Sequence, residues 1–209
     1  ESRQLELLAK DNKGRVVDGS MLVDYDALVL AGFDEEGNVR CFKFDPGSSQ
    51  FSKDASKLVV SAEYFLGYQS AGVVRLGCHS LSTNRMYNQS FYRRNGLLVA
   101  GIDGALHLLM PLQETDFRRL QLLGLHMNCA VAHTAGLNAL EYRAYRSYYV
   151  SATSSLNNSD INPIIDMRLV NEFLSLPAAK RRQIAKKMGS QQRLIFKNLL
   201  EQQLSTVYF

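Results

Sequence analysis

A dense group of basic residues near the carboxyl end is the part of this sequence best suited to bind another molecule. Five cations occur within eight residues and two more follow in the next segment, the seven being Lys180, Arg181, Arg182, Lys186, Lys187, Arg193 and Lys197. Lysine and arginine form charge-assisted hydrogen bonds with phosphates, so the seven are candidates for contact with a nucleic acid or a partner protein. A solvated helix face and a nuclear-import signal fit the same residues.

Residues 177–204 also have the spacing of a helix-turn-helix-like nucleic-acid-binding module. Ala185 is small enough for two helices to cross closely, Gly189 suits the turn, and Ile195 would lie inside the second helix. The two cations of the second segment would then project from a recognition helix. Short helix pairs in many helical domains share this spacing, so it is a weak signal for DNA binding. Contact of the basic residues with RNA fits the same sequence about as well.

The rest of the sequence has no grouping that indicates catalysis, a metal or a cofactor. There is no G-x-S-x-G nucleophile motif, no P-loop and no G-x-G-x-x-G motif. The histidines and cysteines are not spaced as metal ligands, at His79, His107, His126, His133, Cys41, Cys78 and Cys129. We therefore expect a non-enzymatic protein, with packed or solvent-facing histidines and reduced, partly buried cysteines.

The order of apolar residues divides the chain into a β part and an α part. Leu97–Ile102 and Ala105–Leu112 are two apolar runs joined by Asp103-Gly104, which predicts a hairpin with a type I′ turn. Immediately afterwards the apolar residues recur at helical spacing instead. We therefore expect two domains, with strands in residues 1–112 and helices in residues 113–209.

Short segments typical of strands fill the first part. They are Leu5–Lys10, Val16–Val23, Ala27–Phe33, Asn38–Phe44, Leu58–Leu66, Gly72–His79, Leu97–Ile102 and Ala105–Leu112. The turn between the third and fourth contains Gly37, which suits a positive φ, and Pro46–Lys57 and Ser80–Arg94 are expected to be loops. Such strands form a sandwich, a barrel or propeller blades, and eight of them equal about two four-stranded blades. Because two blades cannot close a ring, a propeller here would be a piece of a larger molecule.

The second part contains five helical segments. They are expected at Glu114–Ala132, Asn138–Tyr149, Pro163–Leu174, Pro177–Gly189 and Ser190–Leu204. Asn138 and Ser190 are suitable N-caps, and Gly189 suits a left-handed stop. Ser151–Asn162 is polar and rich in turn-forming residues, so we expect it to be a linker.

The charge is unevenly distributed over the chain. Its 209 residues have a formal net charge of +4, with 12 Lys/Arg against 13 Asp/Glu in residues 1–112 and 12 against 7 in residues 113–209. Any attraction for a polyanion should therefore reside in the helical part. No apolar run is long enough to span a bilayer, so we expect no membrane segment. The chain lacks an initial Met, as expected of a piece of a longer polypeptide.

Several stretches of the sequence resemble a known protein family. They are, in this order, DGALHLLMPLQETDFRRLQLL, AHTAGLNALEYR, DMRLVNEFLSL, AKKMG and LLEQQLSTVYF. The chain is similar to the C-terminal part of the scaffold family that contains the largest subunit of cleavage and polyadenylation specificity factor. The family also contains the large subunit of damaged-DNA-binding protein and a scaffold subunit of the splicing factor that recognises branch sites. The resemblance covers Gly96–Phe209 well and the upstream strands more loosely, and the AGLN segment at Ala135–Asn138 favours the polyadenylation member.

The resemblance implies the last blades of a seven-bladed β-propeller, the third of three, followed by a helical C-terminal domain. It also implies a nuclear scaffold without an active site or cofactor, which acts in pre-mRNA 3′-end cleavage and polyadenylation. Such a scaffold, with the rest of its own chain, holds a WD40-repeat subunit and a zinc-finger subunit so that these two bind the AAUAAA signal. The pre-mRNA would then be contacted through the partners. The Ser/Asn-rich segment Ser151–Asn162 departs from the family, so no partner contact is carried over to it.

Overall fold

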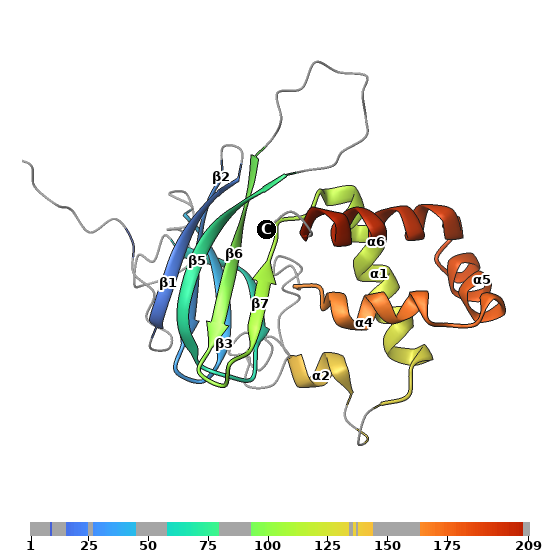
Figure 1. Cartoon of the computed structure of the whole chain (residues 1–209), viewed down its shortest axis with the longest axis horizontal. Coiled ribbons are helices and arrows are strands. Elements are labelled where there is room, and N and C mark those ends of the chain that lie inside the picture. Colours follow the sequence, from blue (N-terminus) through green and yellow to red (C-terminus); the bar gives the residue numbers. More distant parts are fainter. Residues whose placement is uncertain are drawn as a thin grey trace, which may run out of the picture. The chain divides into compact units, whose positions relative to one another are not determined.

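The chain folds into antiparallel sheets followed by helices, as Figure 1 shows. The computed structural model describes residues 9, 16–24, 27–44, 58–79, 93–133, 136, 138–143 and 164–206. The chain separates into two compact units, of which one contains the first four strands and most of the second sheet and the other contains the helices. The expected combination of β and α structure is thus confirmed, whereas the domain boundary at Leu112 stays a prediction.

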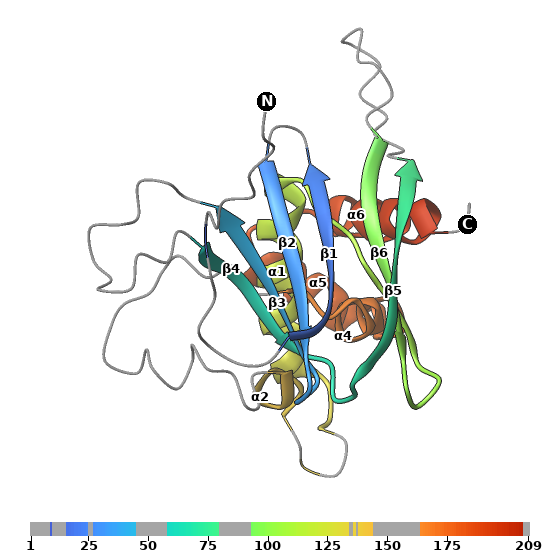
Figure 2. The ribbon, with the colours of Figure 1, turned by 90° about the vertical axis from the view of Figure 1, so that its left-hand side faces the viewer.

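The first sheet has four strands in sequence order, each antiparallel to the next. Its strands are β1 (Val16–Asp24), β2 (Ala27–Asp34), β3 (Asn38–Phe44) and β4 (Leu58–Phe65), and Figure 2 shows them side by side. Phe33 of β2 faces Val39 of β3, and both side chains are almost completely buried. This cross-strand pair therefore contributes to the apolar core of the sheet.

The second sheet has three strands in the order β5, β6, β7. They are β5 (Ser70–His79), β6 (Arg93–Gly101) and β7 (Leu106–Leu109). Leu97 and Val99 of β6 are fully buried, so alternate residues of this strand face the core. Among the described strands, β1, β4, β5 and β7 are edges, and the two sheets do not close into a barrel.

The hairpin at Asp103-Gly104 is confirmed, but the predicted type I′ turn is wrong. Gly104 N donates to Gly101 O at 3.0 Å, and Gly101 N donates to Ala105 O at 2.8 Å. The loop therefore has three residues rather than two, with Gly104 at a φ of +84° closing a turn over Ile102 and Asp103. The Asp103 carboxylate accepts a bond from Ala105 N at 3.0 Å, which favours this longer turn.

Tyr68, in the connection from β4 to β5, lies against the turns of two hairpins. A Cβ atom added to Gly37 would lie 2.9 Å from the Tyr68 carbonyl O, and one added to Gly101 would lie 2.5 Å from the Tyr68 ring. Gly37 has a φ of +85°, which confirms the positive φ predicted for its turn. The Tyr68 hydroxyl is hydrogen-bonded to His107 Nδ1 at 2.5 Å. Tyr68 thus joins the β2–β3 hairpin to the β6–β7 hairpin.

The helical unit is built around an apolar core. Its elements are α1 (Glu114–Ala130), α2 (Ala139–Arg143), α4 (Met167–Asn171), the 3-10 helix η3 (Glu172–Leu174), α5 (Ala178–Lys187) and α6 (Gln192–Thr206). The buried side chains of the core are Leu120, Leu123, Met127, Leu169, Val170, Phe173, Ile184, Ala185, Ile195 and Leu199. Their spacing of three or four residues within α1 and α6 turns one apolar stripe of each helix inward.

Most predicted strands agree with the structure to within two residues at each end. Two differ more, because β6 begins at Arg93 rather than Leu97 and β7 ends at Leu109 rather than Leu112. Arg93 and Arg94 were expected in a loop and belong to β6 instead. Other predictions lie outside the described residues, namely the strand Leu5–Lys10 apart from Ala9, the loop Pro46–Lys57, most of the loop Ser80–Arg94 and the linker Ser151–Asn162.

Two helix starts, those of α4 and α6, differ from the prediction by more than one residue. α4 begins at Met167, four residues later than predicted, because the Asp166 side chain caps it by accepting a bond from the backbone N two positions on, at 3.0 Å. α6 begins at Gln192, so Ser190 lies one position too early to be the predicted cap. Asn138 is confirmed as the cap of α2, and the later part of that predicted helix lies outside the described residues.

Candidate functional site

The helix that carries most of the basic residues, α5, has well-defined ends. Its first backbone bond is accepted by Pro177 O at 3.0 Å, so Pro177 is the N-cap and the helix begins one residue later than predicted. At the other end, Gly189 N donates to Lys186 O at 3.1 Å, and Gly189 has a φ of +61°. Ser190 N donates to Ala185 O at 3.0 Å. These two bonds form a Schellman motif and confirm the predicted left-handed stop at Gly189.

Packing of one face of α5 leaves four of its cations in solvent. Ile184 and Ala185 are 6% and 4% exposed and belong to the helical core. The exposed cations are Lys180, Arg182, Lys186 and Lys187. At 3.6 residues per turn, these four cover the half of the helix opposite the buried pair. We call this surface the basic face of α5.

Arg181 has a different role from its neighbours. Its Nη1 donates to Leu174 O at 3.2 Å, and its guanidinium carbon lies 5.2 Å from the centre of the Phe196 ring. The side chain is half-buried. Arg181 therefore links the end of η3 to α6. Its guanidinium contacts a carbonyl oxygen and an aromatic ring of the helical unit itself.

The two predicted contact residues of α6 also differ from each other. Both Arg193 and Lys197 are exposed. Lys197 Nζ lies 3.6 Å from Glu201 Oε1, one turn further along the helix, whereas Arg193 has no ion-pair partner in the described part of the chain. The structure thus divides the seven predicted residues into five cations without a partner among the described residues and two that are engaged within the unit.

Acidic side chains are absent from the stretch that contains these cations. No Asp or Glu occurs between Phe173 and Leu200. Three acidic residues elsewhere in the helical unit form ion pairs, Glu114 with Arg118 at 2.6 Å, Asp116 with Arg119 at 3.7 Å and Asp166 with Arg143 at 3.1 Å. The positive charge of α5 is therefore not compensated by its sequence neighbours.

Three residues predicted to shape a helix-turn-helix lie in the core or in the turn of the α5–α6 pair. Ala185 and Ile195 are 4% and 0% exposed, and Gly189 lies in the connection between α5 and α6 with a positive φ. The two helices are in contact. Binding of a nucleic acid by this helix pair stays a prediction, because helix pairs with other functions have the same geometry.

A polar network that sequence reasoning missed joins α1 to α6. Asn198 is 4% exposed, its Nδ2 donates to Asp116 Oδ1 at 2.8 Å, and its Oδ1 accepts a bond from Arg119 Nη1. Because both ends of the amide have a partner, this polar side chain is accommodated in the core. The signal in the sequence is an asparagine directly before Leu199 in an otherwise apolar stripe. The network fixes the orientation of α6 and therefore which of its residues face solvent.

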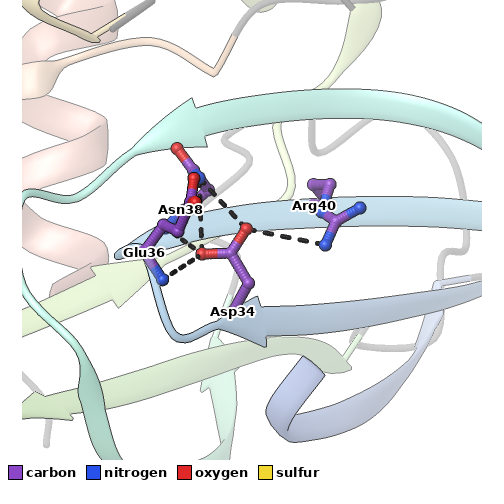
Figure 3. Close-up of polar contacts among 4 residues, drawn as sticks. All are labelled: Asp34, Glu36, Asn38 and Arg40. Carbon is purple, nitrogen blue, oxygen red and sulfur yellow. Dashed lines mark hydrogen bonds and ion pairs between the residues drawn. The ribbon is translucent and has the colours of Figure 1, made fainter. Parts of the chain in front are cut away.

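A second buried polar cluster lies in the hairpin of β2 and β3, and Figure 3 shows it. Asp34, Asn38 and Arg40 are at most 2% exposed. Asp34 Oδ1 accepts bonds from Glu36 N at 3.0 Å and Asn38 N at 2.8 Å, and Oδ2 accepts one from Asn38 Nδ2 at 3.0 Å. Arg40 Nη2 lies 3.5 Å from Asp34 Oδ2. The carboxylate is thus surrounded by donors of its own hairpin, so this cluster stabilises the turn.

Possible metal ligands do not gather in the described part of the chain. Among these residues, no three His, Cys, Asp or Glu side chains are placed to hold a metal ion. The His107 ring is hydrogen-bonded to the Tyr68 hydroxyl, His126 is half-buried and His133 is exposed. In the same residues, every helix is too short or too polar to cross a bilayer.

The two cysteines whose side chains the structure describes, Cys41 and Cys129, are free thiols. Burial raises the pKa of the Cys41 thiol from its usual 9.0 to about 11, so this thiol is protonated at neutral pH and a poor nucleophile. Cys129 was expected to be partly buried and is exposed instead. The reason is its position on α1, about half a turn away from the buried Met127.

The sequence profile of one known family matches most of the chain. The family described as the CPSF A subunit region matches residues 1–175. The match includes all of the described strands together with α1, α2, α4 and η3, and it ends just before α5.

Similar proteins extend this likeness to the helices that follow. Cleavage and polyadenylation specificity factor subunit 1 of Arabidopsis thaliana is 30% identical over 209 residues, and that of Drosophila melanogaster is 29% identical over 210 residues, each covering 100% of this chain. Protein cft1 of Schizosaccharomyces pombe is 24% identical over 202 residues, which are 96% of this chain. The chain spans about 14% of the length of these relatives. With a family profile that covers well over half of its residues, the chain belongs to the family of the CPSF A subunit region.

Proposed function

We propose that this chain is the C-terminal part of a non-enzymatic scaffold subunit that acts in pre-mRNA 3′-end cleavage and polyadenylation. The observation that carries the proposal is the similarity over the whole chain to proteins named as subunit 1 of cleavage and polyadenylation specificity factor. In this function the chain holds other proteins in place, and the chemistry of cleavage is done by other subunits.

The two sheets would be the last blades of a seven-bladed propeller. The first sheet has four antiparallel strands in sequence order, which is the arrangement of a propeller blade, and the second has three described strands. Each blade of a propeller keeps its own edge strands, so open edges at β1 and β7 are compatible with blades of a longer chain. The helices from residue 113 onward would form the separate C-terminal domain.

The partners of the scaffold would be a WD40-repeat subunit and a zinc-finger subunit, which together recognise the AAUAAA signal in the nucleus. The rest of the parent polypeptide would be a third partner, since the chain spans about 14% of its relatives. In this arrangement the pre-mRNA is contacted mainly through the partner subunits, and no membrane takes part.

Co-purification of the parent protein tests this proposal. The parent is tagged, purified from nuclear extract and analysed by quantitative mass spectrometry. We expect the WD40-repeat and zinc-finger subunits in amounts comparable with the parent itself. Recovery of the parent without any 3′-end-processing protein would contradict the proposal.

A second candidate function is a helix-turn-helix-like nucleic-acid-binding module at residues 177–204. It is favoured by the buried Ala185 and Ile195 on either side of the Gly189 turn. Its test is the affinity of the R193A/K197A variant for duplex DNA over a range of salt concentrations. A DNA reader should lose about 0.9 of the salt slope for each phosphate contact removed, whereas a scaffold should show no specific duplex affinity.

A further inference from the structure

We infer that the basic face of α5 binds the sugar-phosphate backbone of RNA directly, without reading its sequence. The four side chains that make the contact are Lys180, Arg182, Lys186 and Lys187. The choice of RNA rests on the proposed function, in which the pre-mRNA otherwise reaches this chain through partner subunits. The ligand chemistry is a row of phosphates, which the geometry and charge of α5 indicate independently.

The positive charge of the basic face is not neutralised by the folded chain. All four side chains are exposed, and none of them has an ion-pair or hydrogen-bond partner among the described residues. α5 is ten residues long, or about 15 Å at 1.5 Å per residue. Since a stacked strand presents a phosphate about every 3.4 Å, a helix of this length can contact several phosphates at once.

The helix dipole favours Lys186 and Lys187, which lie in the last turn of α5, but two other features of its cations are unfavourable for the helix. Lys180 lies in the first turn, where the helix dipole favours acidic residues, and α5 has no acidic residue there. Lys186 follows Arg182 by one turn, and like charges at that spacing destabilise a helix. A bound phosphate backbone would offset both the unfavourable position of Lys180 and the repulsion between Arg182 and Lys186. The placement of charge therefore favours an anionic ligand over a merely solvated surface.

The basic face lacks the apolar side chains that a protein or membrane partner would need. Apart from the cations, its exposed residues are Ala178, Ala179 and Gln183. Protein interfaces depend on large apolar and aromatic anchors, and membrane-bound helices insert a bulky apolar face. Ile184, the bulkiest apolar residue of α5, is buried in the core. Since α5 also has no aromatic side chain on which a base could stack, recognition is limited to the backbone.

The test compares two variants of the 209-residue chain from which the same charge has been removed. The face variant is K180Q/R182Q/K186Q/K187Q, and the control variant K43Q/R75Q/R118Q/R168Q removes four other exposed cations. All eight side chains are exposed, so both variants should fold, and circular dichroism with a melting curve checks this. The affinity for a labelled 20-nucleotide oligouridine and for duplex DNA of the same length is measured at several salt concentrations.

The wild-type chain should bind the RNA, and the face variant should bind it at least about tenfold more weakly at 0.1 M salt, with a salt slope smaller by about 2 to 3. The control variant should stay close to the wild type. A wild-type chain that does not bind RNA, or an equal loss of affinity in both variants, would overturn the inference. Duplex DNA bound through the same four residues without RNA binding would also overturn it, in favour of the DNA-binding module.

Co-purification of the parent protein with the four face substitutions separates this inference from the proposed function. Retained partner subunits together with lost RNA affinity would support a direct RNA contact. Loss of the partners from this variant would instead make the basic face a protein interface and overturn the inference. Absence of the partners from the wild-type parent would contradict the proposed function, and the salt slopes measured on the isolated chain would be unaffected.

Discussion

Single residues of the first sheet show how this chain keeps charge in its interior. Asp34 and Arg40 are both almost fully buried, and their side chains lie 3.5 Å apart. Taking a carboxylate and a guanidinium out of water costs several kcal/mol for each ion unless protein donors and acceptors replace the water. At Asp34 this is done by Asn38 and by the backbone of the turn, so the buried charges are linked to the shape of the hairpin.

Removal of one buried charge should therefore destabilise the sheet strongly. We expect Arg40→Met to lower the free energy of unfolding by about 3 kcal/mol, because Asp34 is left buried without its cationic neighbour. The matched control is Lys43→Met on the same strand, which is exposed and should change the free energy by less than about 0.5 kcal/mol. Urea unfolding followed by circular dichroism measures both. Equal effects of the two substitutions would show that the buried pair has no special role.

The buried thiol of Cys41 should make stability depend on alkaline pH. Its pKa in the folded chain is about 11, above the usual 9.0, because burial disfavours the thiolate. The folded state therefore holds this proton more tightly than the unfolded state. The resulting stabilisation is complete below pH 9 and is lost as the pH rises from 9 towards 11. Urea unfolding at several pH values should show that the free energy of unfolding falls less steeply with rising pH for Cys41→Ala than for the wild type. Identical pH dependences would contradict a raised pKa of the Cys41 thiol.

Residue types alone identified the basic cluster but not which of its members are available to a ligand. The ion pair of Lys197 with Glu201 could have been predicted from their spacing of four on one helix. The contacts of Arg181 could not, because they join it to Leu174 and Phe196 on other elements. Those contacts follow from the packing of η3, α5 and α6 around one core, which a single sequence does not reveal.

At the scale of elements, the connection between α5 and α6 depends on one glycine. Gly189 has a φ of +61°, and a Cβ atom added there would meet no atom within 4 Å. The cost of a side chain at this position is therefore conformational and not steric.

Gly189→Ala should lower the free energy of unfolding by about 1 kcal/mol, because an L-residue is strained in the left-handed region. Gly72→Ala is the matched control, since a Cβ atom there also meets open space but the backbone φ is not in the left-handed region. The control should be neutral or slightly stabilising, because alanine has fewer conformations in the unfolded chain. Thermal or urea unfolding distinguishes the two, and an equal effect would mean that the turn tolerates a side chain.

Strand and helix positions were largely predictable because they depend on local patterns. A short apolar run placed β2 closely, an imperfect alternation placed β3, and the helical stripe placed α1. The class of the β6–β7 turn was not predictable from Asp103-Gly104, since the Asp103 side chain bonds to Ala105 N and selects a longer loop. The start of α4 also depended on a side-chain cap at Asp166.

At the scale of the whole molecule, the described sheets are open and the chain corresponds to about 14% of its relatives. Among the described residues, each sheet keeps open edges, and the polar hairpin of β2 and β3 is buried. In the scaffold function that we propose, the work of the chain lies in extended surfaces. The resemblance predicted the family, which the profile match confirms, whereas the contact residues taken from the basic cluster stay a prediction.

The central claim is that this chain belongs to a scaffold required for 3′-end processing of pre-mRNA. The most direct measurement is AAUAAA-dependent cleavage of a pre-mRNA in nuclear extract depleted of the parent protein, with a mutated hexamer as the control substrate. We predict that depletion abolishes AAUAAA-dependent cleavage. The full-length parent should restore it, whereas a parent lacking these 209 residues should not. Unchanged AAUAAA-dependent cleavage in the depleted extract would contradict the claim.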